Sequence, residues 1–165
     1  MRTYRIFAYL VALEVFVQAA THAYGSAGLG HWIYSDGHTV TKATLEENSD
    51  VDFTGRWAGI VHGEHGAMLV PLLAIAFLVV GFVTRKHVDR GLGWSGIVLG
   101  LVVVQVALGF VSIVVPEVAI LHAVNALLLL LAALHAARLP GRAPNAEAAP
   151  LQAATVERFS PADSS

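Results

Sequence analysis

Four long apolar segments constrain the fold of this chain more than any other feature of its sequence. They cover approximately residues 4–24, 57–84, 92–115 and 118–138. A helix needs about 20 mostly apolar residues to cross the hydrocarbon core of a bilayer, and each segment is long enough. Only 13% of the 165 residues are charged, whereas a soluble domain has about a quarter. The sequence therefore predicts an all-α, integral membrane four-helix bundle spanning residues 1–138.

The charges between the segments predict how the bundle is oriented. Seven of the ten basic residues precede the first segment, separate the second from the third, or directly follow the fourth: Arg2, Arg5, Arg85, Lys86, Arg90, Arg138 and Arg142. The loop 25–56 is acidic instead. Because basic loops stay in the cytoplasm, we expect an up-down-up-down bundle with both termini cytoplasmic and the loop 25–56 outside. The expected location is a cell membrane, such as a bacterial plasma membrane.

Composition also excludes several classes of function. The chain has no cysteine, which rules out disulfides, iron–sulfur clusters and thiolate metal sites. Its formal net charge of −2 gives no basic surface for nucleic acid. Residues 139–165 are rich in Pro, Ala, Ser and Glu, a composition typical of a disordered tail, here a cytoplasmic one.

Polar residues recur inside the apolar segments, at helical spacing. They are Glu14, Gln18 and His22 in the first, His62 and His65 in the second, Gln105 and Ser112 in the third, and His122 and Asn125 in the fourth. Polar groups in lipid are costly, so they face a bundle interior, a cavity or a ligand. Most of these lie in the outer half of the predicted bundle, which indicates one shared site there.

Two histidines on facing helices can ligate one haem iron at both axial positions. We expect His65 and His122 to be these ligands, because their predicted depths are similar. His62, one turn from His65, is a supporting residue or an alternative ligand. Three polar residues are expected near a haem propionate, a proton or a water: Glu14, Gln18 and His22. Gly63 and Gly66 are expected to leave room for a flat macrocycle, and Asn125 to contact the cofactor beside His122.

Other readings of the same residues stay open. A single membrane histidine often only makes an interhelical hydrogen bond. His62 and His65 could also bind zinc or copper together with His22, His31, His38 or Asp36. The GxxxG of Gly96 and Gly100 favours helix–helix packing. No hydrolase or nucleotide-binding motif occurs, so an enzymatic role is uncertain.

The stretch His62-Gly63-Glu64-His65-Gly66 and the later VVVQVALGFVSIVVPEVAILHAVNALLLL resemble one four-helix half of haem A synthase. The pattern is also similar to small four-span membrane proteins of actinobacteria. The resemblance implies a four-helix bundle with haem-facing histidines at His65 and His122. Where the synthase family has Glu-x-x-His-Arg, this chain has His62 for the glutamate and Gly66 for the arginine, and it has a single half.

These observations together predict a membrane protein that binds one b-type haem for electron transfer or haem handling. It would work in membrane lipid, with a redox partner, within a larger membrane complex or as a homodimer. An enzymatic version would be a haem-dependent oxidoreductase. The alternative functions are a haem-free accessory subunit and an outer-face divalent metal-binding protein.

Overall fold

The computed structural model describes residues 1–42 and 51–141 of the chain. The helices are α1 (Arg2–Tyr34), α3 (Arg56–Glu64), the π-helical η1 (His65–Leu69), α4 (Val70–Val83), α5 (Gly91–Val114) and α6 (Val118–Ala137). These described residues contain no strand, only an isolated bridge between Val88 and Gly141. With α3, η1 and α4 counted as one continuous helix, four helices are long and apolar enough to cross a membrane. The all-α prediction and the number of candidate spans are confirmed.

The first helix is longer than the sequence suggested, and the loop that follows it is correspondingly shorter. Residues 25–34, which we expected to begin the loop, continue α1 to Tyr34. Glycines usually weaken a helix, but Gly25 and Gly28 are buried against another stretch of backbone. A Cβ at Gly25 would lie 2.9 Å from the Gly59 nitrogen, and one at Gly28 would collide with the Thr54 carbonyl oxygen. The glycines thus serve close packing inside a helix.

Parts of the loop and of the predicted disordered tail lie outside the described residues. These are positions 43–50 of the loop and 142–165 of the tail. The first residues of the expected tail are structured, since Leu139 is buried and Gly141 pairs with Val88.

The second helix changes its hydrogen-bond pattern just before Pro71. The backbone N–H of Val70 bonds to the carbonyl of His65, five residues back, and Pro71 lies at the start of α4. Proline has no N–H, and its ring clashes with the carbonyl four residues earlier, which disrupts the α-helical ladder at this place. Single π-helical turns of this kind are frequent at functional sites.

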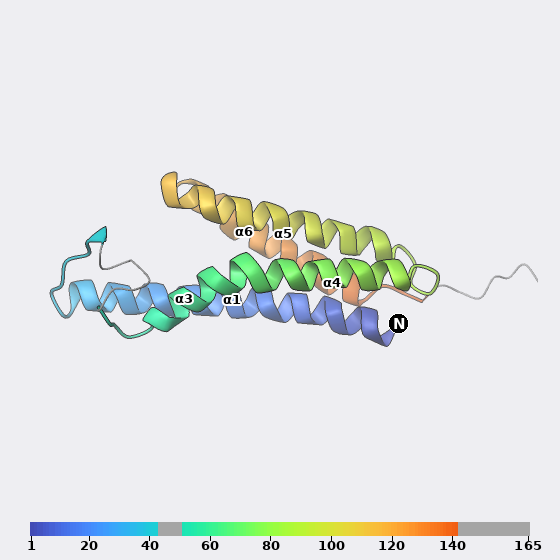
Figure 1. The fold of residues 1–165 in the computed structure, drawn as a ribbon, viewed down its shortest axis with the longest axis horizontal. Helices are drawn as coiled ribbons and strands as arrows, with labels where there is room; N and C mark the ends of the chain where they lie inside the picture. The colour runs from blue at the N-terminus through green and yellow to red at the C-terminus, as the bar shows by residue number, and fades with distance from the viewer. Residues whose placement is uncertain (43–50, 142–165) are drawn as a thin grey trace, which may run out of the picture.

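The hydrophobic core lies toward one end of the bundle, where the chain's N-terminus, the α4–α5 turn and the end of α6 meet (Figure 1). The Tyr4 hydroxyl donates to the Gly91 carbonyl at 2.9 Å, and the Tyr4 ring lies 4.9 Å from that of Phe77. The Arg5 guanidinium donates to the Leu139 carbonyl at 3.5 Å. These contacts join all four helices at this end, which we call the closed end.

Toward the other end the buried core stops. All residues of α5 and α6 are described; the last buried one in α5 is Val102, and the first in α6 is Asn125. In α3 only Ala58 is buried, and in η1 no residue is. Figure 1 shows the α5–α6 pair diverging from α1 and α3 here, with α1 extending beyond the α5–α6 turn. We call this the open end.

The expected packing role of Gly96 and Gly100 is wrong within this chain. A Cβ at either position would meet nothing within 4 Å among the described residues. The close approach between α4 and α5 instead uses Gly81, where a Cβ would collide with the Ser95 hydroxyl. GxxxG spacing predicted a small-residue contact at Gly96 and Gly100, but the rotation of α5 turns Ser95 toward α4 instead.

We expect Gly81→Ala to destabilise the bundle by about 1–3 kcal/mol, because the new methyl group overpacks the contact with Ser95. Gly96→Ala should leave stability unchanged or raise it slightly, since alanine favours helix and the site is open. Thermal unfolding in detergent measures both. Equal losses of stability in the two variants would contradict this account of the α4–α5 contact.

Candidate functional site

His62 lies at the centre of a group of histidines from three helices near the open end. Its Nδ1 is 3.0 Å from the Gln18 carbonyl oxygen on α1. Its ring centroid is 4.8 Å from that of His22 on α1 and 6.4 Å from that of His122 on α6. A carbonyl only accepts hydrogen bonds, so Nδ1 carries the proton of a neutral His62 and Nε2 keeps its lone pair. That nitrogen is chemically able to bind a metal.

His122 is held by one residue of the neighbouring helix. Its Nδ1 donates to the Gln105 carbonyl oxygen at 3.1 Å, and its Nε2 accepts from the Gln105 side-chain amide at 3.0 Å. Asn125 donates to the Gln105 side-chain oxygen at 2.6 Å and to the Leu101 carbonyl at 2.9 Å. The expected cofactor contact Asn125 therefore orients Gln105, which in turn orients His122.

Gln105 was not among the predicted cofactor contacts, although its place on a polar face of α5 pointed to it. Gln105, Gly109 and Ser112 share one face of α5. Gly109 lies directly beside His122: a Cβ there would be 3.2 Å from the imidazole Cε1. This face of α5, made of polar and small residues, accommodates the His122 ring.

His65 belongs to a second group, between η1 and α1. Its Nδ1 lies 3.7 Å from Oε1 of Glu14, and the Gln18 amide donates to the same carboxylate oxygen at 3.2 Å. Gln18 Oε1 is buried without a hydrogen-bond partner among the described residues. It lies against Gly66, where a Cβ would approach it to 3.1 Å. Gly66 thus leaves room for the Gln18 side chain.

The structure therefore gives the two histidines of the second helix different neighbours. The His62 ring lies next to the His122 ring, whereas the His65 ring lies next to the Glu14 carboxylate. Gly63, expected to make room for a cofactor, is exposed, and a Cβ there would meet nothing within 4 Å. No described neighbour requires a glycine at that position.

The π-helical turn explains which residues face the bundle. The buried face of α4 includes Val70, Ala74 and Phe77. In a continuous α-helix, Gly63 would follow this face, since seven residues make about two full turns with only about 20° left over. The π turn adds one residue before Val70, so His62 takes that place. Ala58, four residues earlier and buried, continues the same face.

A divalent metal site is not supported by the described residues. Within positions 1–42 and 51–141, no three His, Asp or Glu side chains are grouped so that they could hold a metal ion. Haem differs in requiring only two axial side chains.

No family model matches this chain, and no curated protein or solved structure matches it significantly.

We expect the Gln105–Asn125 hydrogen bond to contribute measurably to stability. A double-mutant cycle with Gln105→Ala and Asn125→Ala should give a coupling energy of about 0.6–1.7 kcal/mol, the range found for interhelical polar contacts in membranes. Unfolding in detergent of the wild type, both single variants and the double variant supplies the four values. Strictly additive losses would show that the two side chains do not act together.

Proposed function

We propose that this chain is a multi-pass membrane protein that binds one b-type haem between α3 and α6, with His62 and His122 as axial ligands. Its role is electron transfer or haem handling. The observation that carries the proposal is the placement of two imidazoles from different helices with ring centroids 6.4 Å apart.

That spacing suits two imidazoles on opposite sides of one iron. An imidazole nitrogen binds a first-row metal at roughly 2 Å, and the ring centre lies roughly 1 Å farther. Two such rings therefore have centroids roughly 6 Å apart. In both histidines Nδ1 already donates to a backbone carbonyl, the usual support for a metal-bound histidine. At His122, a metal on Nε2 would replace the hydrogen bond from Gln105.

The two histidines lie where the buried core of the bundle ends. The last buried residue of α5 is Val102, and the first of α6 is Asn125. Close to the histidines, Gly66 leaves room for the Gln18 side chain and Gly109 for the His122 ring.

When bound, the haem supplies one-electron redox chemistry. The chain's own residues orient the imidazoles through the carbonyls of Gln18 and Gln105. The Glu14 carboxylate and the His65 imidazole lie 3.7 Å apart on the neighbouring faces of α1 and η1. The hydroxylating activity of haem A synthase does not belong to this proposal, because this chain has His62 and Gly66 where that family has its glutamate and arginine.

Membrane insertion is supported by the outward faces of the helices. Large apolar side chains are exposed on each of them, including Phe16, Leu72, Val114 and Leu127, with Val114 82% exposed. A soluble monomer rarely exposes so much contiguous apolar surface. Six of the eight basic residues in the described parts of the chain lie at the closed end. Basic ends stay inside, so we place this end in the cytoplasm of a bacterial cell, with both termini there and consecutive helices alternating in direction.

The absence of cysteine makes this topology directly testable. In otherwise wild-type chains, Ser35→Cys, just beyond α1, should react in intact cells with a membrane-impermeant maleimide. Lys86→Cys, in the α4–α5 turn, should react only after the cells are lysed. Labelling of Lys86→Cys from outside would reverse the orientation, and labelling of both would contradict membrane insertion.

The haem proposal predicts a low-spin b-type spectrum in the detergent-purified protein after expression with ample haem. His62→Ala and His122→Ala should each abolish the reduced-minus-oxidised α band, because each removes one axial ligand. His65→Ala should retain most of it, and His87→Ala, in the α4–α5 turn, all of it. The wild-type spectrum is the reference for each variant.

Two outcomes would change this conclusion. Loss of the band in His65→Ala with retention in His62→Ala would return the axial role to His65. A colourless wild-type protein would overturn haem binding altogether. It would favour a haem-free membrane subunit, a role consistent with the His122–Gln105–Asn125 hydrogen bonds, which are complete without any ligand.

A further inference from the structure

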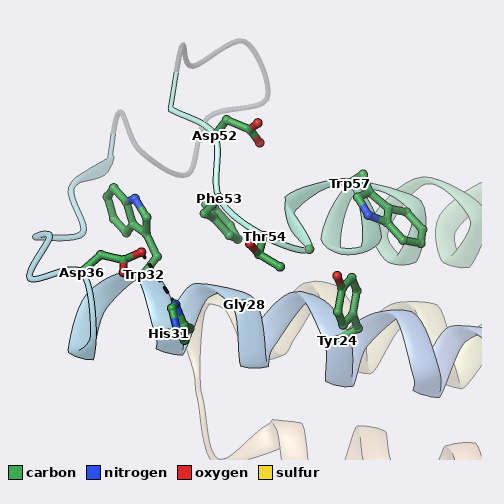
Figure 2. A pocket seen from close by; sticks show the side chains of 10 residues that line it. Tyr24, Gly28, His31, Trp32, Asp36, Asp52, Phe53, Thr54 and Trp57 are labelled. Carbon is green, nitrogen blue, oxygen red and sulfur yellow. Dashed lines mark ion pairs between the residues drawn. The ribbon is translucent and has the colours of Figure 1, made fainter.

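The last turns of α1 and the segment before α3 line an open cavity that is separate from the histidine group. The cavity has a volume of about 540 Å³ and lies between residues 24–36, at the end of α1 and just beyond it, and residues 52–57 (Figure 2). The backbone approach at Gly28 and Thr54 forms its floor. Gly55, with φ of 86°, turns the chain from this segment into α3. Its volume falls in the range of sites for small organic ligands.

Aromatic rings form two walls of this cavity. Tyr24 and Trp57 pair with their centroids 5.9 Å apart, and Trp32 and Phe53 pair at 6.1 Å. All four residues line the cavity, and Figure 2 shows the two pairs at its opposite ends. His38 stacks on Trp32 at 4.4 Å, which holds that indole in place from outside the lining.

Two carboxylates, Asp36 and Asp52, also line the cavity. The facing histidine His31 lies 3.7 Å from Asp36, so it offsets at most one of the two charges, and only when protonated. The described residues that line the cavity include no lysine or arginine. The charges of the lining itself therefore favour a cation over an anion.

We infer that this cavity binds a small organic cation, of the alkylammonium or quaternary ammonium class. Aromatic faces attract such cations through their quadrupoles and also cover their methyl groups. The carboxylates supply the opposite charge. A bare metal ion would gain little from four aromatic rings, and a neutral apolar ligand would leave the carboxylates unused. This site does not depend on haem binding.

The direct test compares choline with its uncharged isostere 3,3-dimethyl-1-butanol, in which carbon replaces the ammonium nitrogen. The protein is purified in a maltoside detergent, which carries no ammonium group. Binding is followed by calorimetry and by the fluorescence of Trp32 and Trp57 in a Trp94→Phe background, since Trp94 is the chain's other tryptophan. Choline should bind saturably, at least about tenfold more tightly than the isostere.

Variants then assign the binding to this cavity. Trp32→Leu and Asp52→Asn should each weaken choline binding by about threefold or more, whereas Trp32→Phe should keep most of it. Asp89→Asn, between α4 and α5 at the closed end, is the matched control and should have no effect. Each variant's circular dichroism shows whether it is folded. The wild-type comparison with the isostere does not depend on any variant.

Choline could stand for a free solute or for the ammonium headgroup of a lipid. Nanodiscs of phosphatidylethanolamine and of phosphatidylglycerol distinguish these sources. Weaker choline binding in phosphatidylethanolamine alone identifies the headgroup as a competitor, and equal binding in both identifies a free cation; either result supports a cation site. Equal affinity for choline and the isostere, no binding of choline, or unchanged binding in both Trp32→Leu and Asp52→Asn would overturn the inference.

Discussion

Pro71 is the constraint on which the arrangement of the histidine group depends. Without an N–H at that position, the helix cannot continue its regular ladder, and one turn adopts the wider pattern from His65 to Val70. The extra residue rotates everything before it relative to the core face of α4. As a result His62 points into the bundle beside His22 and His122, and His65 turns to Glu14. A single missing hydrogen-bond donor thus decides which imidazole is available to a ligand.

The bundle divides its tasks along its length. At the closed end, buried Tyr4, Phe77 and Leu129 pack tightly, and hydrogen bonds from the Tyr4 and Arg5 side chains to backbone carbonyls join distant parts of the chain. At the open end polar contacts replace apolar burial, as in the hydrogen bonds among His122, Gln105 and Asn125. Ligand sites generally occur where local stability is low. Both the histidine group and the aromatic cavity lie at the open end, outside the buried core of the closed end.

The sequence was sufficient to predict what depends on composition and length. Four long apolar segments indicated four helices, and helical spacing placed polar residues on shared faces, including the face of His122 and Asn125. The sequence was not sufficient to predict which residues face each other, because this depends on how each helix is rotated about its axis. The pairing of His62 with His122 follows from the π turn, and Gly96 and Gly100 face away from α4 because Gly81 meets Ser95 instead. The glycines after Tyr24 suggested a loop, because their packing partner, the backbone of residues 54–59, is distant in the sequence.

The continuous helix α1 contributes residues to both the histidine group and the aromatic cavity. Tyr24, at the aromatic cavity, follows His22, at the histidine group, by two residues on one helix. Trp57 and His62 are likewise both on α3. α1 meets α3 through the backbones of Gly25 and Gly59, with the Tyr24–Trp57 and His22–His62 ring pairs on either side. The distance between α1 and α3 therefore sets both the wall of the aromatic cavity and the position of His62.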